Sequence, residues 1–217
     1  MTTLTAAPLA LLLDRLFAEA DAKRPELAGL PAEELQALMH SKTGYLELYS
    51  RLKDFALPVS RETGRLLYLL ARSSQATTIV EFGTSFGLST LHLAAALRDN
   101  GGGRLITSEF EPSKVNIARQ NLSAGGLADL VEIRVGDALQ TLSNDLPEQI
   151  DLVLLDGAKP LYPAILDLLQ SRFKPGALIV ADNADHSPEY LARVRSAGGG
   201  YVSLPFADDV ELSMRVG

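Results

Sequence analysis

The chain has 217 residues and a formal net charge of −7, with 47% hydrophobic and 22% charged residues. This length suits one sizeable domain, and the composition is that of an ordinary soluble protein. The acidic balance disfavours nucleic-acid phosphates and anionic membrane surfaces as partners. The sequence has no cysteine, which excludes disulfides, thiolate metal ligands and cysteine nucleophiles and suits a cytoplasmic location.

The first third of the chain is predicted to be helical. Leucines 9, 12, 13 and 16 recur at helical spacing and predict an amphipathic helix that packs on this subunit or on a partner. Their apolar run is too short for a membrane span and has no basic residue before it, so we expect no signal peptide. Two more helices are expected, one beginning at Pro31-Ala-Glu-Glu34 and one with Ser60 as its N-cap.

From residue 77 onward, short apolar runs alternate with helical stretches. Strands are predicted at residues 78–82, 104–109, 131–135, 151–155, 178–181, 201–204 and 210–215. Helices are predicted between the first six strands, at residues 89–97, 113–123, 138–142, 162–173 and 188–196. This order indicates an α/β fold, a doubly wound, Rossmann-like, mostly parallel seven-stranded sheet. The last connection is short enough to form a hairpin, which makes one strand antiparallel.

A glycine turn follows the first strand, in Ile79-Val-Glu-Phe-Gly-Thr-Ser-Phe-Gly-Leu-Ser89. The spacing Glu81-x-Gly83-x-x-x-Gly87 differs from the dinucleotide fingerprint G-x-G-x-x-G. Glu81 would repel a pyrophosphate, but it could help to hold a ligand with a cationic amine, and S-adenosylmethionine has one. The alternative is a tight strand-to-helix turn that binds nothing.

Acidic residues also end the second and third strands. Glu109 could accept hydrogen bonds from two ribose hydroxyls, and Asp137-Ala138 follows the third strand where an adenine edge could be recognised. Each acid alone could instead be a helix N-cap, and for Asp137 the two interpretations have equal weight. Three such positions on three successive strand ends favour a nucleoside pocket.

Asp156 ends the fourth predicted strand, and Asp182 and Asn183 end the fifth. Neighbouring strand ends bring these oxygen groups together, and such hard ligands suit Mg²⁺, Mn²⁺ or Ca²⁺. Lys159 lies three residues after Asp156, and a nearby divalent cation would lower the pKa of its ammonium group. The alternatives are loop-capping carboxylates and a solvated lysine at the start of the next helix.

Together these motifs make the sequence resemble the class I S-adenosylmethionine-dependent methyltransferases. Within that class it resembles the cation-dependent O-methyltransferases, the group of catechol and caffeoyl-coenzyme A O-methyltransferases. The resemblance runs from about residue 58 to residue 215 and rests on Pro58-Val-Ser60, Glu81-Phe-Gly83, Glu109, Gly136-Asp-Ala138, Leu155-Asp-Gly-Ala-Lys159, Lys174-Pro-Gly176, Ala181-Asp-Asn183 and Glu211-Leu-Ser213. It implies one domain, with residues 58–217 as the cofactor-binding core and residues 1–57 as a helical cap or dimer arm.

The resemblance also implies the roles of individual residues. The cofactor S-adenosylmethionine would be held by Val59, Glu81, Gly83, Thr84, Ser89, Glu109, Asp137, Ala138 and Asp156. Asp156, Asp182 and Asn183 would bind the metal, Mg²⁺ or alternatively Mn²⁺ or Ca²⁺, and Lys159 would be the general base. The expected reaction is methyl transfer to one hydroxyl of a catechol-like small molecule by a cytoplasmic homodimer.

Several points stay open at this stage. Gly157-Ala158 is smaller than in some catechol enzymes, which could widen the acceptor pocket. His186 is expected to be a solvent-exposed loop residue rather than a ligand, and Tyr45 and Tyr49 could line the substrate entrance or simply pack between helices. The rival functions are a non-catalytic nucleoside-binding or regulatory protein, a nicotinamide-dependent dehydrogenase, and a methyltransferase acting on RNA or protein.

Overall fold

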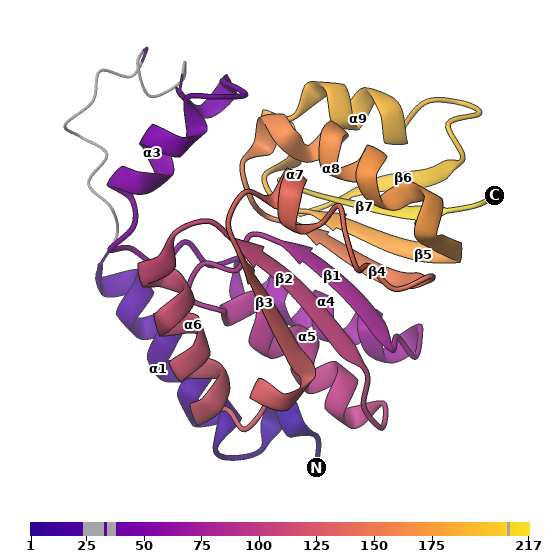
Figure 1. The fold of residues 1–217 in the computed structure, drawn as a ribbon. Helices are drawn as coiled ribbons and strands as arrows, with labels where there is room; N and C mark the ends of the chain where they lie inside the picture. Colours follow the sequence, from indigo (N-terminus) through magenta and orange to yellow (C-terminus); the bar gives the residue numbers. More distant parts are fainter. Residues whose placement is uncertain (24–32, 34–37, 208) are drawn as a thin grey trace.

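The computed structural model describes residues 1–23, 33, 38–207 and 209–217, and its centre is a seven-stranded sheet (Figure 1). The strand order is β3-β2-β1-β4-β5-β7-β6. The strands are β1 (Thr78–Phe82), β2 (Arg104–Glu109), β3 (Val131–Val135), β4 (Ile150–Leu155), β5 (Phe173–Ala181), β6 (Tyr201–Phe206) and β7 (Val210–Arg215). The first five strands are parallel, and β7 runs antiparallel to both β5 and β6. The predicted doubly wound sheet with its antiparallel hairpin is confirmed.

Helices surround this sheet. They are α1 (Leu9–Ala22), α3 (Tyr45–Arg51), α4 (Arg61–Ser73), α5 (Leu88–Asp99), α6 (Pro112–Ala124), α7 (Ala138–Thr141), α8 (Tyr162–Leu169) and α9 (Pro188–Val194). Short 3₁₀ helices occur at Thr3–Thr5, Ala128–Leu130, Lys159–Leu161, Gln170–Arg172 and Ala184–His186. Ser60 caps α4 as predicted, because its hydroxyl accepts the Thr63 N–H at 3.0 Å. The helix predicted at Pro31-Ala-Glu-Glu34 lies outside the described residues, apart from Glu33.

Two apolar cores lie on the two faces of the sheet. Along each central strand successive side chains point to opposite faces, so Ile79 belongs to one core and Val80 to the other. The core that contains Ile79 is covered by α1, α4 and α5, and the core that contains Val80 by α7, α8 and α9 (Figure 1). With helices on both faces, the carboxyl ends of the parallel strands form one open edge where a site can be built.

The boundary between α8 and β5 differs from the prediction. The sequence predicts a helix over residues 162–173 and a strand from residue 178, but α8 ends at Leu169, a 3₁₀ turn follows, and β5 begins at Phe173. Pro175 favours extended backbone at the residue before it, which suits the early start of β5 at Phe173. Phe173 pairs with Ile150 on β4, before a break in the register. The other boundaries from residue 77 onward differ by no more than two residues.

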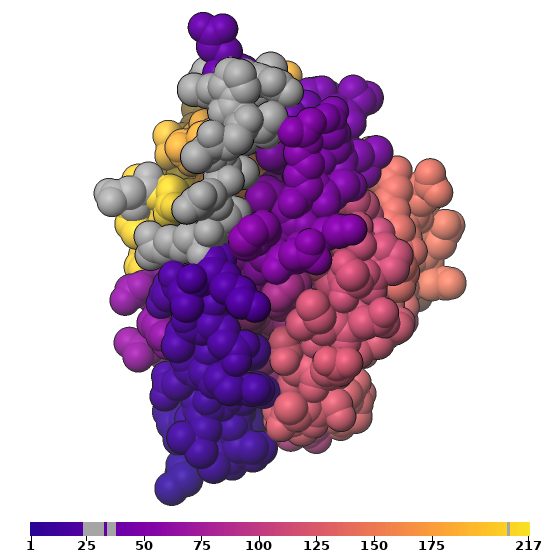
Figure 2. All heavy atoms as spheres, turned by 90° about the vertical axis from the view of Figure 1, so that its left-hand side faces the viewer, coloured from indigo at the N-terminus to yellow at the C-terminus, as the bar shows by residue number. Residues whose placement is uncertain are grey.

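Helix α1 packs on this chain's own core. Leu9, Leu12, Leu13, Leu16 and Phe17 are all buried against it. The helix lies beside α6, with α3 above it (Figures 1 and 2). The apolar face that suggested a dimer contact is therefore used within the chain, and a homodimer stays a prediction without that support. Within the described ranges, no helix combines the length and apolar character needed to cross a membrane.

Two adjacent leucines of α1 provide a matched test of this packing. Leu12 is 6% exposed and Leu11 is 70% exposed. We expect Leu12→Ala to lower the free energy of unfolding by about 2–5 kcal/mol because it leaves a cavity in the core. Leu11→Ala should change it by less than about 0.5 kcal/mol. Urea denaturation at several protein concentrations measures both. Equal losses, or midpoints that rise with concentration, would show that α1 serves an interface instead.

Candidate active site

The predicted cofactor residues meet at the carboxyl edge of the sheet. Gly83, Glu109, Asp137, Ala138 and Asp156 come from the ends of four different strands, and all five line one cavity. Helix α3 closes one side of this cavity with Tyr45 and Tyr49. The parallel sheet thus brings together residues that lie up to 73 positions apart in the sequence.

Gly83 allows the turn between β1 and α5 to approach β4 closely. Its φ is +106°, and a Cβ atom there would lie 2.7 Å from backbone atoms of Asp156 and Gly157. Both facts require glycine, because other residues rarely adopt this conformation and backbone atoms cannot easily move aside. The backbone N–H of Asp156 donates to the Phe82 carbonyl at 2.8 Å, which ties the same two strand ends together.

Glu81 lies behind the cavity rather than in its lining. It is fully buried, and its two carboxylate oxygens accept the hydroxyls of Ser89 and Thr90, each at 2.6 Å. Burial raises its pKa to about 7, against the lowering effect of these hydrogen bonds. Glu81 therefore anchors the first turn of α5, which differs from the direct contact with a cationic amine that the sequence predicts.

Three other predicted cofactor residues also lie behind the lining. Val59 and Ser89 are buried, and the Thr84 hydroxyl shares a 2.6 Å hydrogen bond with that of Thr107. The hydroxyls of Thr84 and Ser89 are thus bonded within the protein, to Thr107 and Glu81. Ser85 was not predicted as a site residue, yet it lines the cavity with a left-handed backbone at φ 48°.

Glu109 is held ready to accept further hydrogen bonds. Its oxygens accept the backbone N–H groups of Ser85 at 2.8 Å and Glu111 at 3.0 Å. Burial raises its pKa despite these hydrogen bonds and the charge of Lys114. Each carboxylate oxygen has a second acceptor position, so the group can still receive two hydroxyls of a ligand.

Asp137 is the helix cap that the sequence offered as one of two interpretations, and it also lies in the cavity lining. It is the N-cap of α7, where its side chain accepts the Leu139 N–H at 2.9 Å, and it lines the cavity beside Ala138. The helix-cap interpretation is therefore correct, and the capping hydrogen bond also fixes the position of the cavity wall.

A second hollow adjoins the first and contains the predicted metal and base residues. Asp156, Lys159, Asp182 and Asn183 all line it, and Asp156 also lines the cofactor cavity. Asn183 has a left-handed backbone with φ 48°, and its amide donates to Asp209 at 3.0 Å. The sharp turn after β5 places Asp182 and Asn183 side by side at the rim.

The two aspartates crowd negative charge into a buried place. Their side chains lie close enough for their charges to interact. Burial raises the pKa of Asp156 even though Lys159 lies beside it, and burial together with the charge of Asp156 raises the pKa of Asp182 to about 8. Two carboxylates that resist ionisation side by side, with an amide oxygen next to them, form a donor set that fits a hard divalent cation.

Lys159 is buried and paired, so the interpretation as a solvated lysine is wrong. Its side chain is 9% exposed, and its Nζ lies 3.1 Å from Asp156 Oδ1. Burial alone lowers its pKa, but the acidic groups Tyr162 and Asp156 raise it by more, to well above its usual range. The protein's own groups therefore keep the ammonium protonated, and the fall in pKa predicted from the sequence requires the added charge of a cation.

Comparison with known proteins assigns this chain to a family. A family model described as a methyltransferase domain matches residues 80–184. A catechol O-methyltransferase of Niastella koreensis is 40% identical over 131 residues, 59% of this chain and 58% of that protein. A catechol O-methyltransferase of Sus scrofa is 30% identical over 155 residues, 67% of this chain and 82% of that protein. The chain belongs to the catechol O-methyltransferase family.

A solved structure agrees with this assignment. The O-methyltransferase TomG of Streptomyces achromogenes, involved in tomaymycin synthesis and solved in complex with S-adenosylmethionine, is 29% identical, with a TM-score of 0.64 over 94% of this chain and 96% of that chain. The match to the Niastella catechol O-methyltransferase spans a little under three fifths of that relative's length.

Two small residues of this family member behave differently from the prediction. Gly157 was expected to widen the acceptor pocket, but the ring of Phe82 fills the space beside it, where a Cβ atom would lie 2.4 Å from the ring. Gly157 and Ala158 line the cofactor cavity instead. His186 lines the second hollow, with a ring centroid 5.9 Å from that of His40, so its loop is not simply exposed to solvent.

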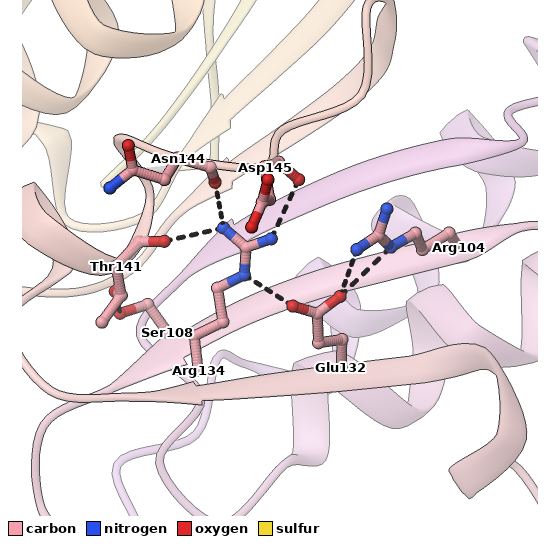
Figure 3. A network of polar contacts seen from close by, with 7 residues as sticks. All are labelled: Arg104, Ser108, Glu132, Arg134, Thr141, Asn144 and Asp145. Carbon is pink, nitrogen blue, oxygen red and sulfur yellow. Dashed lines mark hydrogen bonds and ion pairs between the residues drawn. The ribbon is translucent and has the colours of Figure 1, made fainter.

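An arginine cluster fixes the wall that carries Asp137 and Ala138 (Figure 3). Arg134 on β3 donates to the carbonyls of Thr141 and Asn144 at 2.7 and 2.6 Å and to that of Asp145 at 3.0 Å. Its Nε donates to Glu132 at 2.7 Å, and Glu132 also pairs with Arg104. These bonds hold the end of α7 against the sheet. No sequence pattern indicates this role, because an arginine on an edge strand is ordinarily a solvated residue.

Glu81→Gln tests the electrostatics behind the glycine turn. Because burial raises the pKa of Glu81 from 4.5 to about 7, the folded chain keeps a proton that the unfolded chain loses between these values. The stabilisation from this proton is complete below about pH 4.5 and is lost as the pH rises to 7, a change of about 3 kcal/mol. We expect the unfolding free energy of the wild type, minus that of Glu81→Gln, to fall by this amount in urea titrations across that range. A difference that does not vary with pH would contradict the burial argument.

Proposed function

We propose that the protein is an S-adenosylmethionine-dependent O-methyltransferase that uses a divalent metal to methylate one hydroxyl of a catechol-like small molecule. The observation that carries the proposal is the position of Asp156 between two adjoining hollows. One hollow is lined by Glu109, Asp137 and Ala138, which the sequence predicts to bind a nucleoside, and the other is lined by Lys159, Asp182 and Asn183. A donor and an acceptor bound in the two hollows would meet at this residue.

The first hollow suits S-adenosylmethionine in its hydrogen-bonding groups. Glu109 can accept two ribose hydroxyls, and the wall at Asp137 and Ala138 can accommodate the adenine. The TomG structure, bound to S-adenosylmethionine, has the same fold at 29% identity. The nicotinamide-dependent dehydrogenase alternative is disfavoured, because the glycine turn lacks the dinucleotide spacing.

The second hollow suits a hard cation and an acceptor with two adjacent oxygens. Asp156, Asp182 and Asn183 would hold Mg²⁺, or alternatively Mn²⁺ or Ca²⁺. When bound, the cation supplies positive charge that lowers the pKa of coordinated hydroxyls and offsets the acidic groups around Lys159. With its ammonium pKa lowered and its proton lost, Lys159 Nζ would accept the proton of the reacting hydroxyl. Leu48 and Leu52 give the hollow an apolar side for an aromatic ring.

The buried Asp156–Lys159 pair favours catalysis over the rival function of nucleoside binding alone. A protein that only binds a nucleoside has no need of a charged pair and a second acid in the neighbouring hollow, where their burial costs free energy. The net charge of −7 disfavours methylation of RNA.

Methyl transfer to 3,4-dihydroxybenzoate tests the proposal directly. We expect product formation to require both S-adenosylmethionine and Mg²⁺, and Asp182→Asn to lower kcat/KM at a fixed Mg²⁺ concentration by about 100-fold or more. Asp185→Asn is the matched control, because Asp185 lies three residues away and does not line the hollow, and it should stay within about twofold of the wild type. If S-adenosylmethionine binds in calorimetry but no catechol is methylated, the nucleoside-binding alternative is correct.

The metal role also predicts selectivity for adjacent hydroxyls. A monophenol offers one oxygen, so 3-hydroxybenzoate and 4-hydroxybenzoate should react about 10³-fold more slowly than 3,4-dihydroxybenzoate in kcat/KM. Chelation of Mg²⁺ should remove this preference along with the activity. Monophenols that react as fast as the catechol would show that Lys159 acts without chelation of the acceptor.

A further inference from the structure

Lys114 is a buried lysine that the proposed reaction does not yet use. It lies on α6, is 3% exposed, and lines the cofactor cavity. Among the described residues that line this cavity, it is the single lysine or arginine, whereas Glu109, Asp137 and Asp156 are acids. Burying an ammonium group costs free energy, so its place in the wall calls for a compensating partner.

The Lys114 ammonium group has few direct polar contacts within the protein. Lys114 Nζ donates to the Ser85 hydroxyl at 3.3 Å and lies 5.7 Å from the centre of the Phe86 ring. No carboxylate among the described residues lies within 4.0 Å of it, although Glu109, Asp156 and Glu111 are near enough for their charges to interact with it. An ammonium carries three donors, so Lys114 retains hydrogen-bonding capacity toward the cavity.

Ser85 gives the site its second polar group. Its N–H holds Glu109 at 2.8 Å, and its hydroxyl receives both Lys114 Nζ and the backbone N–H of Leu57 at 3.3 Å. The Lys114 ammonium therefore lies between the carboxylate proposed for the ribose and the glycine turn that begins at Gly83. This is the end of the cavity where the polar tail of a nucleoside ligand would extend from its ribose.

We propose that Lys114 forms an ion pair with the amino-acid carboxylate of S-adenosylmethionine, with Ser85 positioning its ammonium. This inference rests on the proposed function. The cofactor is a cation with one carboxylate, so acidic walls suit its sulfonium and amine, while the carboxylate needs a positive partner. Lys114 is thus a specificity residue, which distinguishes S-adenosylmethionine from nucleosides that lack the carboxylate.

A structural alternative makes a different prediction. Lys114 could instead hold Glu109 in place for the ribose, in which case its loss would weaken every ligand that has a ribose. The backbone N–H groups of Ser85 and Glu111 already orient Glu109 without it. Two ligands that share the nucleoside, sulfonium and amine but differ in the carboxylate can separate the two roles.

The test compares S-adenosylmethionine with decarboxylated S-adenosylmethionine in titration calorimetry. We expect Lys114→Met to weaken binding of the first by about tenfold or more, as for the loss of one partner of a buried charge pair, and to leave binding of the second unchanged or tighter. Ser85→Ala should shift the same ratio in the same direction by less. Lys53→Met, at an exposed lysine outside the cavity lining, is the control and should change neither affinity.

The outcomes separate the two proposals. Equal losses for both ligands in Lys114→Met would overturn the carboxylate pairing and leave the proposed function intact. If Lys114→Met folds poorly, Ser85→Ala still tests the inference. A Ser85→Ala variant with an unchanged ratio of the two ligand affinities would contradict it. A wild-type protein that binds neither ligand would overturn the proposed function and this inference with it.

Discussion

The rest of the structure depends on the crowding of carboxylates at one edge of the sheet. A parallel sheet brings the carboxyl ends of its strands to the same side, and here four neighbouring strands carry Glu81, Glu109, Asp156 and Asp182 at or near these ends. Burial raises the pKa of all four. This is a cost to the folded state that packing elsewhere must offset, and it marks the edge as a place for positive charge.

The negative charges of the four acids are stabilised in different ways, and these differences indicate a different role for each acid. Glu81 is satisfied by two hydroxyls and faces the protein, so it is part of the scaffold. Glu109 is held by backbone N–H groups and faces the cavity, so it is oriented for a neutral ligand group. Asp156 and Asp182 repel each other and share one nearby lysine, so their negative charge is the least compensated of the four. The least compensated negative charge is therefore concentrated at the ends of β4 and β5, and β1 separates these strands from Glu109 on β2.

The sequence was sufficient to predict this edge because the inference needs only the order of the strands and the residues at their carboxyl ends. Acids after successive apolar runs must converge in a parallel sheet, whatever the details of packing. The inference failed where contacts depend on how a helix docks. Nothing in the spacing of Glu81 shows that α5 would present Ser89 and Thr90 to it.

Lys114 looks in the sequence like an ordinary lysine on an amphipathic helix. It becomes buried only when α6 packs beside the glycine turn. At the start of β5, Lys174-Pro-Gly176 contributes to the family resemblance, but the early start of the strand there was not predicted.

The position of Asp156 suggests how donor and acceptor would be aligned. Asp156 lines both hollows, and its backbone N–H donates to the Phe82 carbonyl. Its backbone also lies close to Gly83, in the turn that bounds the first cavity. The relative position of the two reactants is thus set by two adjacent, hydrogen-bonded strand ends rather than by loops. Since rate enhancement in a direct transfer depends on holding the reacting atoms at close range, this rigid connection is where precision is needed. The outer wall of the second hollow comes instead from α1 and α3, through Asp21 and Leu48. These helices lie outside the sheet, so under the proposed function changes in them could fit a different acceptor without disturbing the alignment at the two strand ends.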